Sequence, residues 1–379
     1  MFKIKLKLIM FIISLNISNS NASIDIQPEE KNTNNTSDNN QNTKSIENNS
    51  IEADKKIEIN QIINNTIDKN ITKSPKKIIK FIFKELAPLL KSKSEFNTIT
   101  NDYIQNNLID LLEAKIGKFN NKQKIFNWAI IEGYDSLVEA FLKNNKDNQI
   151  NIDAKIDGDN ALISASEKGH TLIVNTLIDK GAKINLKGEN GSTALNLAAK
   201  NGYLDIVSIL LDNKAAVNTQ DKIGKTALIQ AATNGYSDIV ELLIKNKAKV
   251  NIKDKYGNTA LILASENNNQ DTVNKLIKAK ANINAQNNSK ITALMQASKN
   301  GNIEIATSLI DNHAEINIIN NMGKTALIMA TENNHKDIVE LLLNNNADLD
   351  IPDNNGNTAL KIAEENQYTD IKDMLKKED

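Results

Sequence analysis

The residues of this chain best suited to catalysis or ligand binding are its histidines, its carboxylates and one Gly-Lys-Thr sequence. The three histidines are His170, His313 and His335, and no two of them lie at metal-ligand spacing. Gly224-Lys225-Thr226 resembles the end of a phosphate-binding loop, but the upstream glycine is missing. The sequence also lacks a nucleophile elbow and a dinucleotide-binding fingerprint. These residues therefore indicate no enzyme, no cofactor and no metal site.

The carboxylates recur at a fixed interval, which favours a structural role over paired acid–base catalysis. Asp205, Asp238, Asp271, Glu304, Asp337 and Asp370 are each 33 residues apart. Thr-Ala-Leu has the same period and begins at Thr193, Thr226, Thr259, Thr292, Thr325 and Thr358, with Asn160-Ala161-Leu162 one step earlier. A constant period of this length is typical of a stacked-repeat architecture.

One copy, residues 221–253, predicts a turn followed by two helices. Gly224 gives the turn its backbone freedom, and Thr226 caps the first helix by accepting backbone N–H groups. Gly235 separates the helices, and Asp238 places a negative charge at the start of the second one. The apolar stripes are Leu228, Ala231, Ala232, Ile239, Val240, Leu243 and Ile244. One unit cannot bury these stripes alone, so neighbouring copies must cover them.

These residues resemble the ankyrin repeat over residues 124–375. The resemblance implies an all-α solenoid of helix-turn-helix repeats joined by β-turn or hairpin loops. About eight repeats are expected in residues 121–379. The first is degenerate, with Lys124-Ile125-Phe126 in place of Thr-Ala-Leu, and the last is truncated and polar.

The sequence departs from the ankyrin pattern at two positions. The histidine that commonly follows Thr-Pro-Leu is replaced, for example by Asn196 and Ile229, which leaves its hydrogen bonds in doubt. The glycine after the second helix survives only as Gly181. Elsewhere the position holds Lys214, Lys247, Lys280, His313 and Asn346. If the backbone there is left-handed, each replacement costs on the order of 1 kcal/mol relative to glycine.

Three segments precede the repeats. Residues 1–22 combine Lys3, Lys5 and Lys7 with a short apolar run and a small-x-small end at Ala22, which predicts a cleaved secretory signal. Residues 23–73 are rich in Asn, Ser and Thr and predict a disordered segment, with a weak helix around Ile57–Ile63 as an option. Residues 74–120 predict helices that cap the array. The alternative is that the basic helix near Lys76 lies on an anionic membrane.

The amino-acid composition limits the classes of partner that the chain is expected to bind. The 379 residues carry a formal net charge of -1, and all 46 basic residues are lysines. Lysine lacks the planar fork with which arginine grips phosphate, so nucleic acid is not expected as a partner. There is no cysteine, which excludes disulfides and thiolate sites. We expect a monomer. Membrane contact is expected only if the signal is uncleaved or the helix near Lys76 is interfacial.

The resemblance implies a module that binds a protein partner through its concave face and finger tips. One tip position reads Asn190, Ile223, Tyr256, Ser289, Met322 and Asn355 in successive fingers. Ile223, Tyr256 and Met322 form a broken apolar row, and we interpret them as anchors because aromatic and Met residues are enriched in interfaces. Chance drift, or packing of each residue on its own finger, is the alternative. The other candidates are Lys222, Lys225, Lys255, Asn288, Ile291 and Lys324 at the tips and Asn234, Glu266 and Lys299 on the first helices.

The predicted signal indicates export across a bacterial inner membrane, to the periplasm or outside the cell. By analogy, an exported module of this kind suggests a secreted effector. An envelope-tethered structural or adaptor protein is the second hypothesis. A third is an accessory that presents substrate to a separate enzyme, for which the sequence offers no support.

Overall fold

The computed structural model describes residues 61, 62, 65, 122–143, 145, 150–155 and 157–376. The chain divides into two compact units, Met1–Glu58 and Ile59–Asp379, and all described residues belong to the second. The predicted signal and nearly all of the predicted disordered and capping segments lie outside the described residues. Residues 61, 62 and 65 are helical, and Ile62 is partly buried against the hydrophobic core.

The described part of the chain is an all-α repeat solenoid in which helices come in pairs. The first helices of successive pairs are α5 (Lys122–Glu132), α7 (Ala161–Lys168), α9 (Ala194–Asn201), α11 (Ala227–Thr233), α13 (Ala260–Glu266), α15 (Ala293–Asn300), α17 (Ala326–Glu332) and α19 (Ala359–Glu365). The second helices are α6 (Asp135–Lys143), α8 (Thr171–Asp179), α10 (Leu204–Asp212), α12 (Ser237–Lys245), α14 (Gln270–Lys278), α16 (Ile303–Asp311), α18 (Lys336–Asn344) and α20 (Thr369–Leu375).

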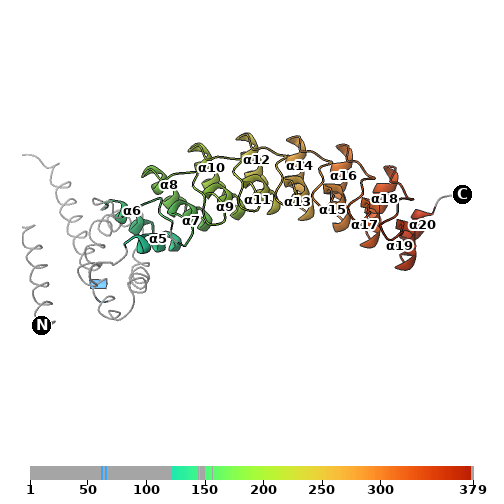
Figure 1. Cartoon of the computed structure of the whole chain (residues 1–379), viewed down its shortest axis with the longest axis horizontal. Helices are drawn as coiled ribbons and strands as arrows, with labels where there is room; N and C mark the ends of the chain where they lie inside the picture. Colours follow the sequence, from blue (N-terminus) through green and yellow to red (C-terminus); the bar gives the residue numbers. More distant parts are fainter. Residues whose placement is uncertain are drawn as a thin grey trace, which may run out of the picture. The chain divides into compact units, whose positions relative to one another are not determined.

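The two kinds of helix form two parallel rows. Each first helix packs against its own second helix and against the first helix of the next pair, and second helices pack on second helices. Figure 1 shows the row of second helices along the outer edge of a gentle arch and the first helices along its inner edge. Because each pair contacts only its neighbours, the array grows in one dimension.

Local side-chain chemistry starts each first helix where the sequence predicts. The hydroxyl of Thr226 accepts the backbone N–H of Ile229 at 3.2 Å, and the other five repeat threonines accept equivalent bonds. Asn160 does the same for α7. At the position in doubt, Asn196 completes a capping box with Thr193 and donates to the carbonyl of Thr219 at 3.2 Å. Asn196 therefore supplies an inter-repeat hydrogen bond that Ile229 cannot.

The predicted acids lie at the start of the second helices. Asp205, Asp238, Asp271, Glu304, Asp337 and Asp370 all occupy first turns. There the negative charge stabilises the positive end of the helix dipole. The interaction of each acid with a helix dipole therefore accounts for their period.

The core is one continuous apolar cluster along the array. Ala231, Ala264 and Ala297 are fully buried, which lets neighbouring first helices approach closely. In the degenerate first pair, the buried rings of Phe126 and Phe141 meet edge to face with centroids 6.2 Å apart. These large side chains fill a pair that has lost the Thr-Ala-Leu start.

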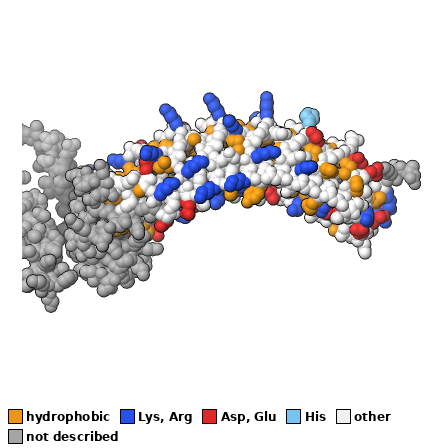
Figure 2. Space-filling model, viewed as in Figure 1, with side chains coloured by type: hydrophobic (Ala, Val, Ile, Leu, Met, Phe, Trp, Pro, Cys, Tyr) orange, Lys and Arg blue, Asp and Glu red, His pale blue; other side chains and the backbone are white. Residues whose placement is uncertain are grey.

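The backbone after the second helices is left-handed, as the glycine of the family pattern implies. Gly181 has a φ of 85°, and Lys214, Lys247 and Lys280 have φ of 63°, 66° and 62°. His313 and Asn346 share this conformation at 68° and 65°. Figure 2 shows lysines projecting along the edge that carries the second helices. Several repeats thus hold a non-glycine residue in a conformation that favours glycine.

Candidate functional site

Each connection between successive helix pairs contains a five-residue loop, here called a finger. In the finger of residues 221–225, the Asp221 N–H donates to the Lys225 carbonyl and the Gly224 N–H to the Asp221 carbonyl, both at 3.0 Å. Gly224 has a φ of 81°, a left-handed conformation that favours glycine. The same two bonds close the fingers of residues 188–192, 254–258, 287–291, 320–324 and 353–357.

The first residue of a finger holds the loop with its side chain. Asp254 Oδ1 accepts the N–H groups of Tyr256 at 2.9 Å and Asn258 at 2.8 Å. The same pair of bonds is made at the equivalent residues Asp221, Asn287, Asn320 and Asp353. The backbone N–H groups of Asn357 and Asn355 hold the pKa of Asp353 below its usual range. Sequence reasoning missed this position, although its period of 33 was the available signal.

Backbone hydrogen bonds also connect each finger to the next. The N–H of Lys255 donates to the carbonyl of Ile223 at 2.9 Å, and that of Asn288 to Tyr256 at 2.9 Å. Equivalent bonds join Lys222 to Asn190, Asn321 to Ser289 and Asn354 to Met322. The fingers from 188–192 to 353–357 therefore form a connected row. Adjacent fingers are spaced by about the 10 Å of helix packing.

The three predicted anchors project from this row. Their side chains are 43% (Ile223), 61% (Tyr256) and 54% (Met322) exposed, while their carbonyls accept the bonds between fingers. The backbone of each anchor is therefore held while its apolar side chain meets solvent. Ser289 occupies the place between Tyr256 and Met322, so the apolar row is interrupted.

The other predicted tip residues divide by their place in the finger. Lys222, Lys255 and Asn288 hold the second position and are exposed, and Asn288 also donates from its amide to the Lys255 carbonyl at 2.9 Å. Lys225, Ile291 and Lys324 hold the fifth position and are half-buried. Ile291 packs against the core, and Lys324 pairs with Glu332 on α17 at 2.5 Å. The fifth position thus contributes more to packing than its place in the loop suggests.

The predicted first-helix residues Asn234, Glu266 and Lys299 are exposed at the ends of α11, α13 and α15. The amide of Asn234 donates to the Gln230 carbonyl at 2.9 Å, which caps α11. The structure therefore gives Asn234 an intramolecular role and leaves Glu266 and Lys299 exposed.

Two of the histidines join repeats. His335 Nε2 lies 3.0 Å from the Lys299 carbonyl, and His170 Nε2 lies 3.1 Å from the Ile131 carbonyl. Both rings also cover a glycine of the preceding repeat, Gly301 and Gly133, where a Cβ would meet the imidazole within 3 Å. Packing explains these histidines. Within the residues that the structure describes, no three His, Asp or Glu side chains are grouped to hold a metal ion.

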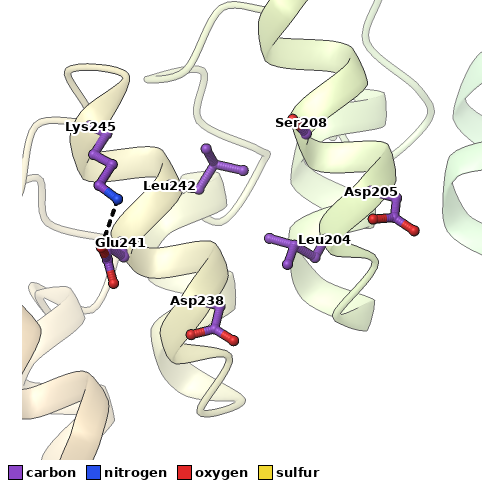
Figure 3. A pocket seen from close by; sticks show the side chains of 7 residues that line it. All are labelled: Leu204, Asp205, Ser208, Asp238, Glu241, Leu242 and Lys245. Atoms are coloured by element: carbon purple, nitrogen blue, oxygen red, sulfur yellow. Dashed lines mark ion pairs between the residues drawn. The ribbon is translucent and has the colours of Figure 1, made fainter.

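A cleft of about 400 Å³, which sequence reasoning missed, opens between α10 and α12. Leu204 and Leu242 extend into it from opposite sides (Figure 3). On its rim Glu241 pairs with Lys245 at 2.7 Å and with Lys275 at 3.0 Å. Hydrogen bonds from these lysines lower the pKa of Glu241 to about 2. This carboxylate is therefore held ionised by its neighbours and is poorly suited to proton transfer near neutral pH.

Comparison with known proteins identifies the repeat. A family model described as ankyrin repeats (3 copies) matches residues 103–188, 126–221, 186–254, 214–287 and 294–379. The first match begins at residue 103, inside the predicted capping segment 74–120. It therefore starts upstream of residue 124, the first residue of the resemblance seen in the sequence. No curated protein matches the chain. Among the described residues, no helix has the length and apolarity needed to cross a bilayer.

Proposed function

Since the chain belongs to the ankyrin repeat family, a family of protein–protein interaction modules, we propose that it binds a protein partner through its finger row and the exposed ends of its first helices. The observation that carries the proposal is the exposure of Ile223, Tyr256 and Met322 on a hydrogen-bonded row of fingers. Large apolar side chains on a stiff support lose little entropy on binding, which is the property of interface anchors. Ankyrin repeat proteins are typically non-enzymatic.

The surface around the anchors suits a partner with acidic groups at the rim of its contact. Lys222 and Lys255 are exposed next to Ile223 and Tyr256 in their fingers. Rim charges mainly set the association rate and its salt dependence, whereas buried apolar anchors set the lifetime of a complex. Ile223, Tyr256 and Met322 should therefore control dissociation.

We expect that the triple variant Ile223→Ala/Tyr256→Ala/Met322→Ala abolishes partner binding and leaves the melting temperature unchanged, because all three side chains are exposed. The full chain would serve as bait for affinity capture, and the identified partner would then be titrated calorimetrically. The matched control is Leu172→Ala/Leu204→Ala, which removes two exposed leucines, 67% and 40% exposed, from the second helices. Equal binding by the triple variant and the wild type would disprove the role of the anchors.

Export and a role as a secreted effector are the finer parts of the proposal, and they rest on the signal-like residues 1–22. We expect Ser23 as the first residue of the mature protein in a soluble extracytoplasmic fraction, measured by N-terminal sequencing. An intact Met1 in a membrane fraction would instead support the envelope-tethered adaptor, the alternative function.

A further inference from the structure

The edge of the array along the second helices carries an uncompensated basic stretch. It comprises the exposed residues Lys247, Lys249, Lys278 and Lys280, and Figure 2 shows lysines projecting along this edge. Within the described residues none of the four lies in an ion pair. Lys247 and Lys280 also sit in left-handed backbone, where lysine is less favourable than glycine. Residues held in such conformations point to a use for the side chain.

The same edge becomes acidic in the next two repeats. Three exposed acidic residues lie there: Asp311 at the end of α16, Glu315 in the loop after α16, and Asp348 in the loop after α18. Asp311 stands one period after Lys278, and Asp348 stands three periods after Lys249. Positive and negative charges therefore occupy equivalent positions in different repeats, which we call the basic stretch and the acidic stretch.

We propose that two copies of the chain associate antiparallel along this edge, with the basic stretch of each copy against the acidic stretch of the other. A two-fold axis near the boundary between these stretches places residues 278–282 opposite residues 311–315 of the second copy. It also places residues 245–249 opposite residues 344–348. Such an arrangement is isologous, so it closes as a dimer. This dimer replaces the monomer expected from the sequence.

A second copy fits this edge better than another anion does. Its acidic groups recur at the same repeat spacing as the lysines, so charges stay in register over successive repeats. An extended polyanion or an anionic membrane running along the edge would meet Asp311, Glu315 and Asp348 beyond the basic stretch and be repelled. The proposal is independent of the finger anchors, because it uses residues on the second-helix edge.

Because exposed ion pairs are weak and screened, the dimer should depend strongly on salt. The full chain would be studied by sedimentation equilibrium as its concentration is raised. At about 0.01 M salt the Debye length is about 30 Å, and the mean mass should rise toward twice that of the monomer. At about 1 M salt the Debye length is about 3 Å, and the mean mass should return to the monomer value.

Charge exchange between equivalent positions tests the geometry. Lys249→Asp/Lys278→Asp and Asp311→Lys/Asp348→Lys each install residues that the array already carries at equivalent sites, so folding should be retained. Each double variant alone should lose self-association by about tenfold or more, because like charges then face each other. An equimolar mixture of the two should form heterodimers, and the quadruple exchange should restore the homodimer.

Circular dichroism of each variant would confirm that the helices are intact. Monomeric wild-type protein at low salt would overturn the proposal, and so would folded double variants that fail to pair when mixed. A wild-type chain that stays monomeric but binds poly-glutamate would show that the basic stretch serves a different acidic partner, which also contradicts the dimer.

Discussion

The combined variant Lys214→Gly/Lys247→Gly/Lys280→Gly should have a free energy of unfolding about 2–3 kcal/mol larger than that of the wild type. Left-handed backbone costs a non-glycine residue roughly 1–2 kcal/mol, and each glycine removes this cost. Part of the gain is lost because glycine makes the unfolded chain more flexible. All three lysines have positive φ. They lie in different repeats, so their contributions should nearly add. Chemical denaturation at high salt would measure the gain without a contribution from self-association.

The control for this prediction is Lys249→Gly, two residues from Lys247 and outside the left-handed region. It gains no relief of strain and should be neutral or destabilising by up to about 1 kcal/mol. A triple variant no more stable than the wild type would show that lysine bears no penalty at these positions. If the triple variant is more stable yet no longer dimerises, the lysines exchange stability for binding, a known trade-off.

Asp254→Ala should destabilise the array by about 3 kcal/mol, because two charge-assisted hydrogen bonds are lost and their donors are left without a partner. Asp254 is 6% exposed, and its Oδ1 accepts the N–H groups of Tyr256 and Asn258. The same variant should weaken partner binding, because the finger that presents Tyr256 loses its internal support. Chemical denaturation and calorimetry would measure the two effects.

Asp254→Asn is the matched control. Asn287 and Asn320 already make the same pair of bonds in their own fingers, so this variant should stay within about 1 kcal/mol of the wild type. A fall in stability for Asn as large as for Ala would indicate that the charge of Asp254, and not its geometry, matters.

The helices and their caps could be predicted because they depend on short-range chemistry that recurs. Thr226 lies three residues before Ile229, whose backbone N–H its hydroxyl oxygen accepts, so this cap can be recognised in the sequence. The left-handed loops were a conditional expectation from the family's glycine, which survives at Gly181 and is replaced by lysine at Lys214. In both cases the residue that gives the signal lies within a few positions of the structure it determines.

The finger row was harder to predict because its bonds run between repeats. The ladder from Lys255 to Ile223 uses backbone groups, which leave no trace in residue identity. The role of the first finger position was missed because its residue type varies between Asp, as at Asp254, and Asn, as at Asn287. Either side chain offers an Oδ1 that accepts the two backbone N–H groups of the finger. The ankyrin resemblance assigned Ile291 and Lys324 to the tips, but the fifth finger position turns inward toward the core and α17.

The bonds that join the fingers connect the same atoms at each step, and this has a consequence for how the array can diversify. Loss or gain of one 33-residue unit would leave the ladder intact, because any finger can donate to any other. Deleting the unit that contains Ser289 would bring Met322 beside Tyr256 and close the gap in the apolar row. Unequal recombination would thus change which partner the surface recognises without any substitution in the repeats that remain.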